Sequence, residues 1–574
     1  MNILGIVAHT LGYGDASATL SVDGKIIGIV EEERFSRIRY DDGFPGKAIN
    51  YLLKKGGIPG TKIDIVALHL HPLRGISKRL PWVLRNPHYT LINSGDYLRY
   101  YLRYGNLYRK LVDHLGSNSF EIKYYGHHLC HAAAAFYTSS FEHAAFLSLD
   151  GAGEGLVGSI GIASRKEGVR ILRKFIYPFS LGIFYSAICD YIGFPAPAGP
   201  GKVMALAAYG DTKKFMPLFR KLIQVREDSL WLDLDFFLFH KNLATPISDK
   251  PWMSKKFTNS VGVKRRKKDE KLLGIHIDLA AALQERTNEI GIELSRLAAK
   301  LTNETNLCLG GGVALNSVMN GAIFRDLSFK NIHIQPAAGD AGNSLGAVYL
   351  AALEVESRMP HFEGMPFTGP SFNDEEIETE FKNYNLTYRL SSDIALEAAR
   401  AIKDGFIVGW FQGGMEFGPR ALGARSILAD PQHPEMKGII NGYVKYREWF
   451  RPYAPSVTSE ACNRYFMEPK DNPYMLIVTS VREEWRKIFP SITHIDGSAR
   501  VQSVSKETNP LFHRLLEYLG QIHKHPVVLN TSFNVKAPIV CTPEDAIKCF
   551  LNTQIDILCI GNFIVRKDNN GITI

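Results

Sequence analysis

The segment GHHLCHAAAAFYTSSFEHAAFLSLDGAGEG, residues 126–155, decides how the rest of the chain is interpreted. His127 and His131 are four residues apart, so on a helix both imidazoles point to the same side and could bind one metal ion. The apolar run that follows ends at Asp150, a candidate oxygen ligand. A histidine pair at this spacing is, on its own, more often a surface or packing feature, so the metal site needs support from elsewhere in the chain.

The end of this apolar run also suits a phosphate. Asp150 and Gly151 stand where a buried strand gives way to glycines. Such a turn presents a carboxylate to a phosphate-bound metal and lets the backbone approach closely. We therefore expect Asp150 to be both a ligand and catalytic, and Gly151 to lie against a bound nucleotide.

The same order of elements occurs twice in the first half of the chain. Residues 3–33 predict a strand, a polar turn, a second strand, an Asp23-Gly24 turn and a third strand, and residues 144–175 repeat this order. We interpret the repeat as an internal duplication. Two such lobes predict an α/β fold of the actin, hexokinase and Hsp70 type, although a fold pattern alone establishes no chemistry.

A glycine-rich turn further along is a candidate nucleotide site. In NLCLGGGVALN, an apolar strand runs into Gly310, Gly311 and Gly312 and then into a helix. Backbone N–H groups at such a helix start can approach a phosphate or adenosine, and Asn316 is placed to add a side-chain contact. The next strand ends at Asp340, a further acid that we expect in the cleft.

The segment PAPAGPGKVMA resembles a P-loop only superficially, because Ala196 and Val203 replace the first glycine and the Ser/Thr of that motif. A rigid loop that delivers Lys202 to a helix start can still face an anion such as a nucleotide phosphate. An ordinary turn with an exposed lysine is an equally good interpretation.

A shift in composition marks a domain boundary. Residues 356–374 are dense in proline and glycine and have neither helical nor strand periodicity. We predict one domain over residues 1–355, a linker over 356–374 and a smaller domain over 375–574.

The smaller domain carries a cluster of cations. Arg420 and Arg425 lie among glycines, and Lys445, Arg447 and Arg451 follow at even spacings. If that segment is extended, all three side chains lie on one face and repel one another unless an anion joins them. A phosphate or carboxylate ligand accounts for them better than acidic partners from the core do.

Two turns near the end complete this candidate site. Arg500 follows the turn in HIDGSAR, and an apolar strand breaks at Asn530 and Ser532. Small polar side chains at such a break can orient a polar group, although the break alone is a routine turn.

The composition limits the function classes. The chain has 574 residues, 45% hydrophobic and 22% charged, which is typical of a globular protein of several domains. We expect no membrane span and a cytoplasmic location, and the seven scattered cysteines favour reduced core thiols. The net charge of +9 suits nucleic acid or small phosphorylated anions. We interpret the basic run 264–268 as a solvated loop and do not expect nucleic-acid binding, and residues 72–118 suggest no role.

Taken together, the ordered motifs GHHLCHAA, LSLDGAGE, GGGVALN, AAGDAGNSLGA, FGPRALGARSIL, VKYREWFRPYAPSV, HIDGSARVQSV and VLNTSFN resemble a known family. Over nearly the whole length the chain is similar to the O-carbamoyltransferases of nodulation-factor, cephalosporin and aminoglycoside biosynthesis. The resemblance implies an actin-like (ASKHA) N-terminal domain related to the threonylcarbamoyl-transfer enzymes and a C-terminal YrdC-like domain. It further implies that carbamoyl phosphate and ATP form a carbamoyl adenylate, whose carbamoyl group passes to a hydroxyl of a small-molecule acceptor.

The family's functional positions can be carried over. Its iron-type metal site (Fe²⁺ or a similar divalent ion) falls on His127, His131, Asp150 and Asp340, and its adenylate site falls on Gly310 to Gly312 with Asn316. Carbamoyl-phosphate binding falls on Arg420, Lys445, Arg451, Arg500, Asn530 and Ser532, with Mg²⁺ as the ion that accompanies ATP. Among these, His127, Asp150, Lys445 and Arg451 are the expected catalytic residues.

The chain departs from the family on the expected acceptor side. Tyr13-Gly14-Asp15 stands where the family has histidine and aspartate, and Arg39-Tyr40 replaces the usual Lys-His. Asp15 is our candidate base. The acceptor and a homodimeric state stay open, as do two alternatives: a threonylcarbamoyl-type tRNA modification enzyme and a non-catalytic actin-type ATP-binding protein.

Overall fold

The computed structural model describes residues 1–8, 15–71, 105–242, 251–363, 365–467 and 471–567. Tyr13, Gly14 and most of the 72–118 segment therefore lie outside the described residues. The chain forms two compact units, one of residues 1–36 and 40–363 and the other of residues 37–39 and 364–574. The division after residue 363 falls inside the predicted linker 356–374. Below they are called unit 1 and unit 2.

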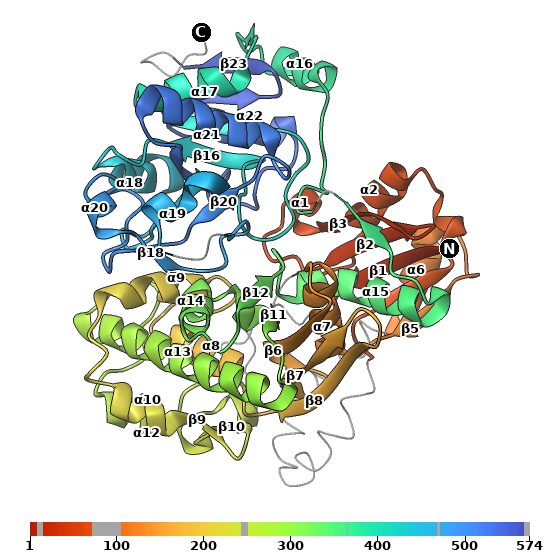
Figure 1. The fold of residues 1–574 in the computed structure, drawn as a ribbon, viewed down its shortest axis with the longest axis vertical. Coiled ribbons are helices and arrows are strands. Elements are labelled where there is room, and N and C mark those ends of the chain that lie inside the picture. The colour runs from red at the N-terminus through yellow and green to blue at the C-terminus, as the bar shows by residue number, and fades with distance from the viewer. Residues whose placement is uncertain (9–14, 72–104, 243–250, 364, 468–470, 568–574) are drawn as a thin grey trace. The chain divides into compact units, whose positions relative to one another are not determined.

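Unit 1 contains two main sheets (Figure 1). The first has the order β13-β3-β2-β1-β4-β5 and the second the order β12-β11-β6-β7-β8. The strands of the first are β1 (Asn2–Val7), β2 (Ser17–Val22), β3 (Lys25–Glu31), β4 (Ile65–Leu68), β5 (Glu121–Tyr124) and β13 (His361–Phe362). Those of the second are β6 (His143–Gly153), β7 (Leu156–Ser164), β8 (Gly168–Ile176), β11 (Asn306–Gly310) and β12 (Asn331–Ile334).

The two sheets share one strand pattern. In each, three strands run as an antiparallel meander, and two further strands join the first of them in parallel. The order β3-β2-β1-β4-β5 thus corresponds to β8-β7-β6-β11-β12. The predicted hairpins at Asp23-Gly24 and 166–168 are present in this meander. Both sheets have the predicted order, and their origin by duplication stays a prediction.

Helices α7 (His127–Tyr137) and α15 (Asn343–Glu356) pack together, and α15 also packs on β1. Their small residues allow close contact: a Cβ on Gly5 of β1 would lie 2.1 Å from the Ser344 oxygen of α15. Ala347, Val348 and Ala351 fill the shared core with Cys130 of α7. This packing fixes the helix that carries both histidines.

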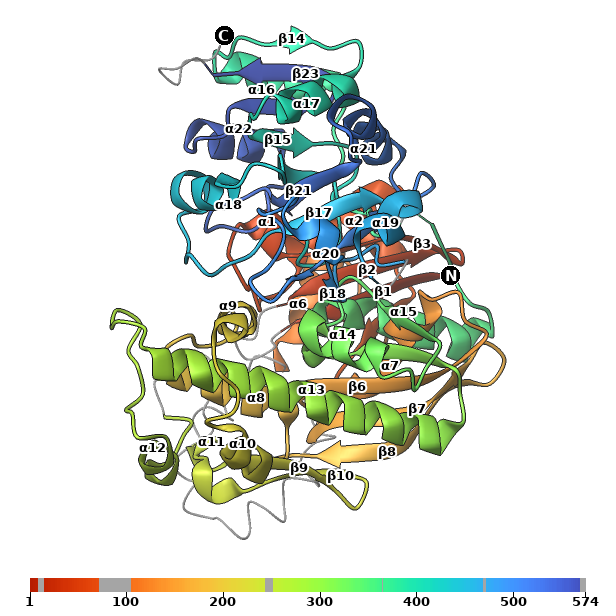
Figure 2. The ribbon, with the colours of Figure 1, turned by 60° about the vertical axis from the view of Figure 1, so that its left-hand side comes forward.

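Further helices cover the second sheet. The longest is α13 (Gly274–Thr302; Figure 2), whose apolar side chains Leu279, Leu283, Ile290 and Leu294 are buried. The others in unit 1 are α1 (Glu33–Ser36), α2 (Gly46–Gly56), α6 (Leu107–Leu115), α8 (Leu181–Tyr191), α9 (Gly199–Leu206), α10 (Met216–Leu222), α11 (Phe239–Asn242), α12 (Lys255–Val261) and α14 (Ser317–Arg325). A short hairpin joins β9 (Ile223–Arg226) and β10 (Ser229–Leu232). No helix in the described ranges is long and apolar enough to cross a bilayer.

The basic run 264–268 is an exposed loop, as the sequence predicted, except that Arg266 is buried. Arg265 makes two hydrogen bonds to the carboxylate of Asp190, at 2.6 and 2.8 Å. Arg266 is buried, donates to the carbonyl of Ile192 and lies 5.2 Å from the Phe194 ring centroid. Two cations of the run therefore anchor it to the end of α8, because a buried guanidinium needs carbonyl or carboxylate partners.

Unit 2 is built on one eight-stranded sheet, in the order β14-β23-β22-β15-β16-β21-β17-β20. The strands are β14 (Arg389–Leu390), β15 (Val408–Phe411), β16 (Arg425–Ala429), β17 (Ala454–Thr458), β20 (Gln502–Val504), β21 (Val527–Ser532), β22 (Ile557–Ile560) and β23 (Phe563–Arg566). A separate pair joins β18 (Thr479–Ser480) and β19 (Ser498–Ala499).

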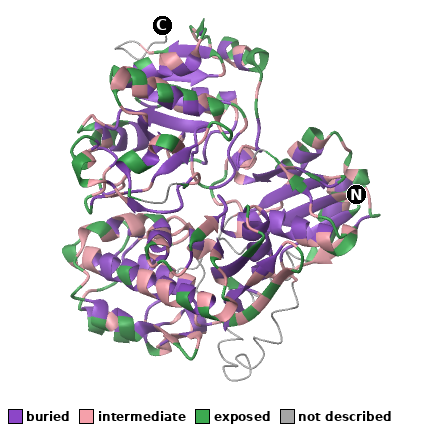
Figure 3. Ribbon diagram, viewed as in Figure 1, coloured by how far each residue is buried: buried purple, intermediate pink, exposed green. Residues whose placement is uncertain are grey.

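Apolar cores cover both faces of this large sheet, as the buried strands in Figure 3 show. Trp410 and Leu428 face one core, whereas their neighbours Phe411 and Ile427 face the other. The helices are α16 (Asp374–Asn383), α17 (Ile394–Lys403), α18 (Met436–Ile439), α19 (Cys462–Tyr465), α20 (Glu483–Arg486), α21 (Pro510–His523) and α22 (Pro543–Leu551).

Candidate functional site

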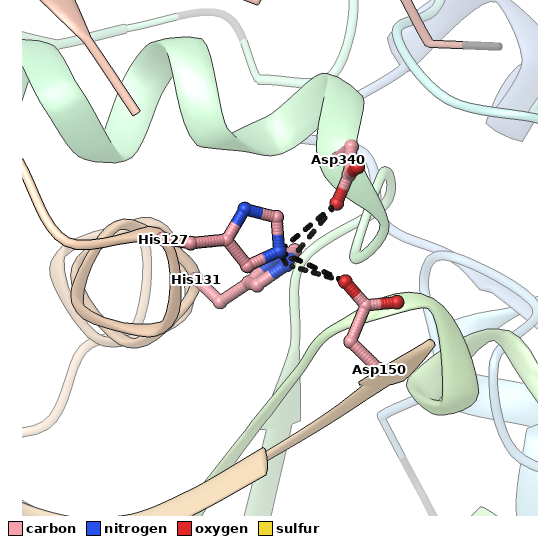
Figure 4. Close-up of side chains that lie close together, drawn as sticks. All are labelled: His127, His131, Asp150 and Asp340. Atoms are coloured by element: carbon pink, nitrogen blue, oxygen red, sulfur yellow. Dashed lines mark hydrogen bonds and ion pairs between the residues drawn. The ribbon is translucent and has the colours of Figure 1, made fainter. Parts of the chain in front are cut away.

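Four side chains predicted as metal ligands meet in unit 1 (Figure 4). The Nε2 atoms of His127 and His131 are 3.1 Å apart. Asp150 Oδ2 lies 2.9 Å from the first of these nitrogens and 3.3 Å from the second. Asp340 Oδ1 lies 3.4 and 3.3 Å from the same two atoms.

These separations fit one small cation. Bonds of about 2.1 Å that meet at roughly 90° to 110° separate ligand atoms by roughly 3.0 to 3.4 Å. Two imidazoles with two carboxylates are ligands of the kind that Fe²⁺ and Zn²⁺ accept. Both imidazoles are buried, whereas both carboxylates are partly exposed. The four residues could therefore hold a divalent metal, with access from the carboxylate side.

The glycines beside this cluster place its ligands. Asp150 Oδ1 accepts hydrogen bonds from the backbone N–H groups of Gly151, at 2.7 Å, and Gly312, at 3.2 Å. This leaves Oδ2 turned to the histidines. A Cβ on Gly153 would lie 2.2 Å from the His127 ring, so only glycine leaves room there. Two glycines predicted for the nucleotide thus orient the carboxylate of Asp150, a candidate metal ligand.

The charges of the cluster support one another. Burial lowers the pKa of His131, but hydrogen bonds to Asp150 and Asp340 outweigh it and raise this pKa to about 9. Burial raises the pKa of Asp150, but its hydrogen bonds with His127 and His131 outweigh this effect and leave the pKa well below its usual range. A protonated His131 thus takes the place of a cation in the metal-free cluster.

We expect metal affinity to rise with pH. The metal must displace the His131 proton, so the apparent affinity should increase by about tenfold per unit from about pH 7 and level off near pH 9. The stability of the metal-free protein should instead decrease as the pH rises. A raised pKa contributes stability that is complete below the unfolded value and is lost as the pH rises through about 9. Competitive titration with a chelator across this range, corrected for the chelator's own protonation, measures the affinity; a pH-independent affinity would contradict the expectation.

The other predicted residues of unit 1 lie in different surroundings. Asp15 has a positive φ of 79°, and burial and then the charge of Asp340 raise the pKa of its carboxyl. Asn316 caps α14 by accepting from the Met319 N–H, and its amide pairs with that of Gln284. Lys202 lies within α9, 5.7 Å from the Phe194 ring centroid.

The sequence analysis did not identify two neighbours of the candidate metal site. His69, which follows β4, has its ring centroid 5.5 Å from that of His127, and burial lowers its pKa to about 3. The Asn343 amide nitrogen lies 3.2 Å from His131 Nε2. Neither position belongs to a recognisable local motif, since strand pairing and helix packing bring each to the cluster.

In unit 2, strand register gathers the predicted anion-binding residues. Ser426 of β16 pairs with Ser532 of β21, and Ala454 of β17 pairs with Asn530 of β21. Gln502 of β20 lies beside Ser456 of β17. The starts of three strands and the end of a fourth therefore share one edge of the sheet. The segments just before these starts carry Arg420, Arg451 and Arg500, and the strand end carries Ser532.

The cations at this edge influence one another. Burial lowers the pKa of Arg500 well below its usual range, and the charges of Arg420 and Arg451 lower it further. Burial and then Arg447 lower the pKa of Arg451 to about 10. Positive charges that are buried together destabilise one another until an anion binds. Arg39, which groups with unit 2, adds one more positive charge near Lys445.

The segment that carries Lys445 is not extended as the even spacing suggested. Residues Ile440–Lys445 form a π-helix, and Tyr446 has a left-handed backbone with φ 47°. Arg447 turns inward to donate to Asn441 Oδ1 and the Pro452 carbonyl, with its guanidinium 4.3 Å from the Tyr453 ring. Arg447 thus has a structural role and does not share the predicted anion-binding face with Lys445 and Arg451.

Lys445 and Asn530 are largely held by the protein itself. The Lys445 ammonium donates to the carbonyls of Ser532 and Asn534, at 2.6 and 2.8 Å, and to the Asn534 side chain at 2.7 Å. The Asn530 amide nitrogen donates to Ala421, Ser456 and Gln502, whereas its oxygen is buried with no hydrogen-bond partner among the described residues. These contacts hold the 530–534 turn against the loop of Arg420.

Arg425 opens β16 and is fully buried. Its guanidinium donates to the carbonyls of Gln412, Gly413, Ala424 and Pro370 and lies 3.6 Å from the centroid of the Phe411 ring. Arg425→Met should lower the free energy of unfolding of unit 2 by about 3 kcal/mol, because it leaves four carbonyls without a donor. Urea unfolding measures this loss, and the exposed Arg566→Met should change the free energy by less than about 0.5 kcal/mol. Equal effects of both variants would contradict the role of Arg425.

Comparison with known proteins identifies the family. The chain matches the family described as carbamoyltransferase N-terminus over residues 2–349, and that described as carbamoyltransferase C-terminus over residues 399–567. The chain belongs to the carbamoyltransferase family. It is 38% identical to an uncharacterized protein of Synechocystis sp., over 99% of this chain and 97% of the relative.

Two relatives have informative names. Nodulation protein NolNO of Sinorhizobium fredii is 34% identical, over 96% of this chain and 79% of the relative. The 3'-hydroxymethylcephem-O-carbamoyltransferase of Streptomyces clavuligerus is 31% identical, over 62% of this chain and 63% of the relative. The protein is accordingly an enzyme of the carbamoyltransferase kind.

Proposed function

We propose that this carbamoyltransferase is an ATP-dependent O-carbamoyltransferase that works in two steps. Unit 2 makes carbamoyl adenylate from carbamoyl phosphate and ATP, and unit 1 transfers the carbamoyl group to a hydroxyl of a small-molecule acceptor, such as a natural product or a sugar. We infer in addition that unit 1 is actin-like and unit 2 YrdC-like. The shared strand order of the two sheets in unit 1 supports the first of these assignments.

The observation that carries the proposal is the group of cations at one sheet edge of unit 2. Arg420, Arg451 and Arg500 reach that edge from three different strand connections, and each lies close enough to affect another's pKa. A multiply charged anion offsets their repulsion and gains charge-assisted hydrogen bonds. Carbamoyl phosphate and the triphosphate of ATP are both anions of this type.

The proposed first step comprises two reactions, hydrolysis of carbamoyl phosphate and adenylation of the carbamate. Water cleaves carbamoyl phosphate into carbamate and phosphate, and a carbamate oxygen then attacks the α-phosphorus of ATP. Pyrophosphate leaves with Mg²⁺, and carbamoyl adenylate remains. Arg420, Arg451 and Arg500 can stabilise the charge on the phosphoryl groups during both reactions.

The second step forms a carbamate ester. The acceptor oxygen attacks the carbamoyl carbon, AMP leaves, and the acceptor gives up its proton. A divalent metal such as Fe²⁺, held by His127, His131, Asp150 and Asp340, would polarise the carbamoyl oxygen or the adenylate phosphate. Asp15 is our candidate proton acceptor, and its raised pKa makes it a stronger base than an ordinary aspartate.

Pyrophosphate exchange tests the proposal. Purified protein with ATP, Mg²⁺ and carbamoyl phosphate should incorporate labelled pyrophosphate into ATP, and omitting carbamoyl phosphate should abolish this exchange. With hydroxylated acceptors, mass spectrometry should then find a product heavier by one CONH unit. No exchange with carbamoyl phosphate would refute the proposed first step.

The two alternatives give other results. A threonylcarbamoyl-type tRNA modification enzyme should bind tRNA with a steep salt dependence. A non-catalytic actin-type protein should bind ATP without releasing pyrophosphate. Neither alternative accounts for a carbamoyl-phosphate-dependent exchange in the absence of tRNA.

A further inference from the structure

We propose that Glu416 is a positioning residue that holds Arg420 in the cation cluster of unit 2. The inference rests on the proposed function of that cluster. Glu416 itself is not among the residues expected to contact a substrate. Glu416 lies on the connection between β15 and β16, four residues before Arg420.

The Glu416 carboxylate organises the loop from inside. Only 2% of the residue is exposed. Its Oε1 atom accepts hydrogen bonds from the backbone N–H groups of Leu422, at 2.7 Å, Ala424, at 3.3 Å, and Arg425, at 3.2 Å. One oxygen atom thus joins three of the residues that directly follow Arg420. Its other oxygen is buried with no hydrogen-bond partner among the described residues.

Contacts at both ends of the loop between β15 and β16 hold its backbone in one conformation. Arg425 bonds to the carbonyls of Gln412 and Gly413, at the start of the loop. Gly418 and Gly423 have φ values of 101° and 99°, a backbone conformation that residues other than glycine rarely adopt. Gln502 and Asn530 donate to the carbonyls of Leu422 and Ala421. Arg420 therefore sits near the tip of a loop whose backbone is fixed on both sides.

A rigid loop keeps Arg420 near two other cations that repel it. Arg420 lies close enough to Arg451 and Arg500 to lower the pKa of each. A long side chain on a mobile loop would relieve this repulsion by moving into solvent. Because Glu416 fixes the backbone, the cation stays near the others before an anion arrives. The free energy of binding is then not reduced by the need to order the loop.

The test uses Glu416→Gln, which has the same shape without the charge. We expect its KM for carbamoyl phosphate in pyrophosphate exchange to rise by about tenfold, with kcat changed by less than about threefold, since charged acceptors make roughly twice as strong a hydrogen bond as neutral ones. In an Arg420→Ala background, Glu416→Gln should add less than about twofold, because the cation that it positions is gone. Glu416→Asp, which keeps the charge but is shorter, should resemble Glu416→Gln.

Asp430→Asn is the matched control. Asp430 is also a buried acid, but it follows the other end of β16 and accepts from Gln432. This variant should leave the KM for carbamoyl phosphate within about twofold of the wild type. A purely structural role for Glu416 would lower the melting temperature without changing KM, or would give effects that multiply with those of Arg420→Ala. Either result would overturn the proposal.

Calorimetric titration with inorganic pyrophosphate keeps this inference separate from the proposed function. Wild-type protein should bind it more tightly than Glu416→Gln and Arg420→Ala, and the double variant should match Arg420→Ala. This comparison needs no turnover. If the wild type shows no exchange but the coupling appears in the titration, the proposed function fails while the role of Glu416 holds. Equal binding by wild type and Glu416→Gln would refute that role directly.

Discussion

Arg451→Ala is expected to lower carbamoyl-phosphate-dependent pyrophosphate exchange by about 100- to 1,000-fold, the usual effect of removing one group that stabilises transition-state charge. Arg451 lies just before β17, and burial and the surrounding cations lower its pKa to about 10. Its guanidinium is the most suitable test of the cluster, because Lys445 already donates to the Ser532–Asn534 turn. Loss of Lys445 would therefore disturb that turn as well as remove a charge.

The matched control is Arg566→Ala. Arg566 ends β23 in the same unit and stands over the Phe406 ring, at 4.7 Å. Its loss should change exchange by less than about twofold. Metal binding should be the same in both variants, since the expected ligands belong to unit 1. Arg451→Ala with wild-type exchange would remove this residue from the proposed site.

Much of the candidate metal site could be predicted from the sequence, because local rules govern the placement of its four residues. The spacing of His127 and His131 is a helical one, and Asp150 lies near the end of β6, directly before a glycine. Asp340 likewise stands at the start of a short helical turn after β12. Each of these placements depends on a few neighbouring residues. The sequence could not show how close the four groups would come, because the packing of α7 and α15 decides that.

The loops of unit 2 show where sequence patterns mislead. The even spacing of Lys445, Arg447 and Arg451 suggested one face of an extended segment, but a π-helix and a left-handed Tyr446 separate their directions. In unit 1, the Asn316 oxygen caps α14, and the expected nucleotide contact of this residue stays a prediction. Arg425 was expected among the anion-binding cations, whereas it is buried and donates to backbone carbonyls.

His127→Ala should impair metal binding and carbamoyl transfer, whereas Arg451→Ala impairs pyrophosphate exchange. Removing one of four ligands should weaken metal binding by at least about 100-fold, since even outer partners of metal ligands contribute about 10- to 100-fold. Transfer to the acceptor should fall with it. Pyrophosphate exchange should stay within about threefold of wild type, because the cations of unit 2 are unchanged. Metal content by mass spectrometry, exchange and product formation are measured on the same preparation.

His128→Ala is the control for this variant. His128 is the next residue of the same helix and is equally buried, but its ring bonds to Ser148 at 2.8 Å instead of joining the four ligands. It should keep the metal, because the two Nε2 atoms and two carboxylates remain. If His127→Ala abolished exchange as fully as transfer, the two steps would not be assigned to separate sites. If both histidine variants kept metal and transfer, the cluster would be a buried ion-pair network in which a protonated His131 supplies the positive charge.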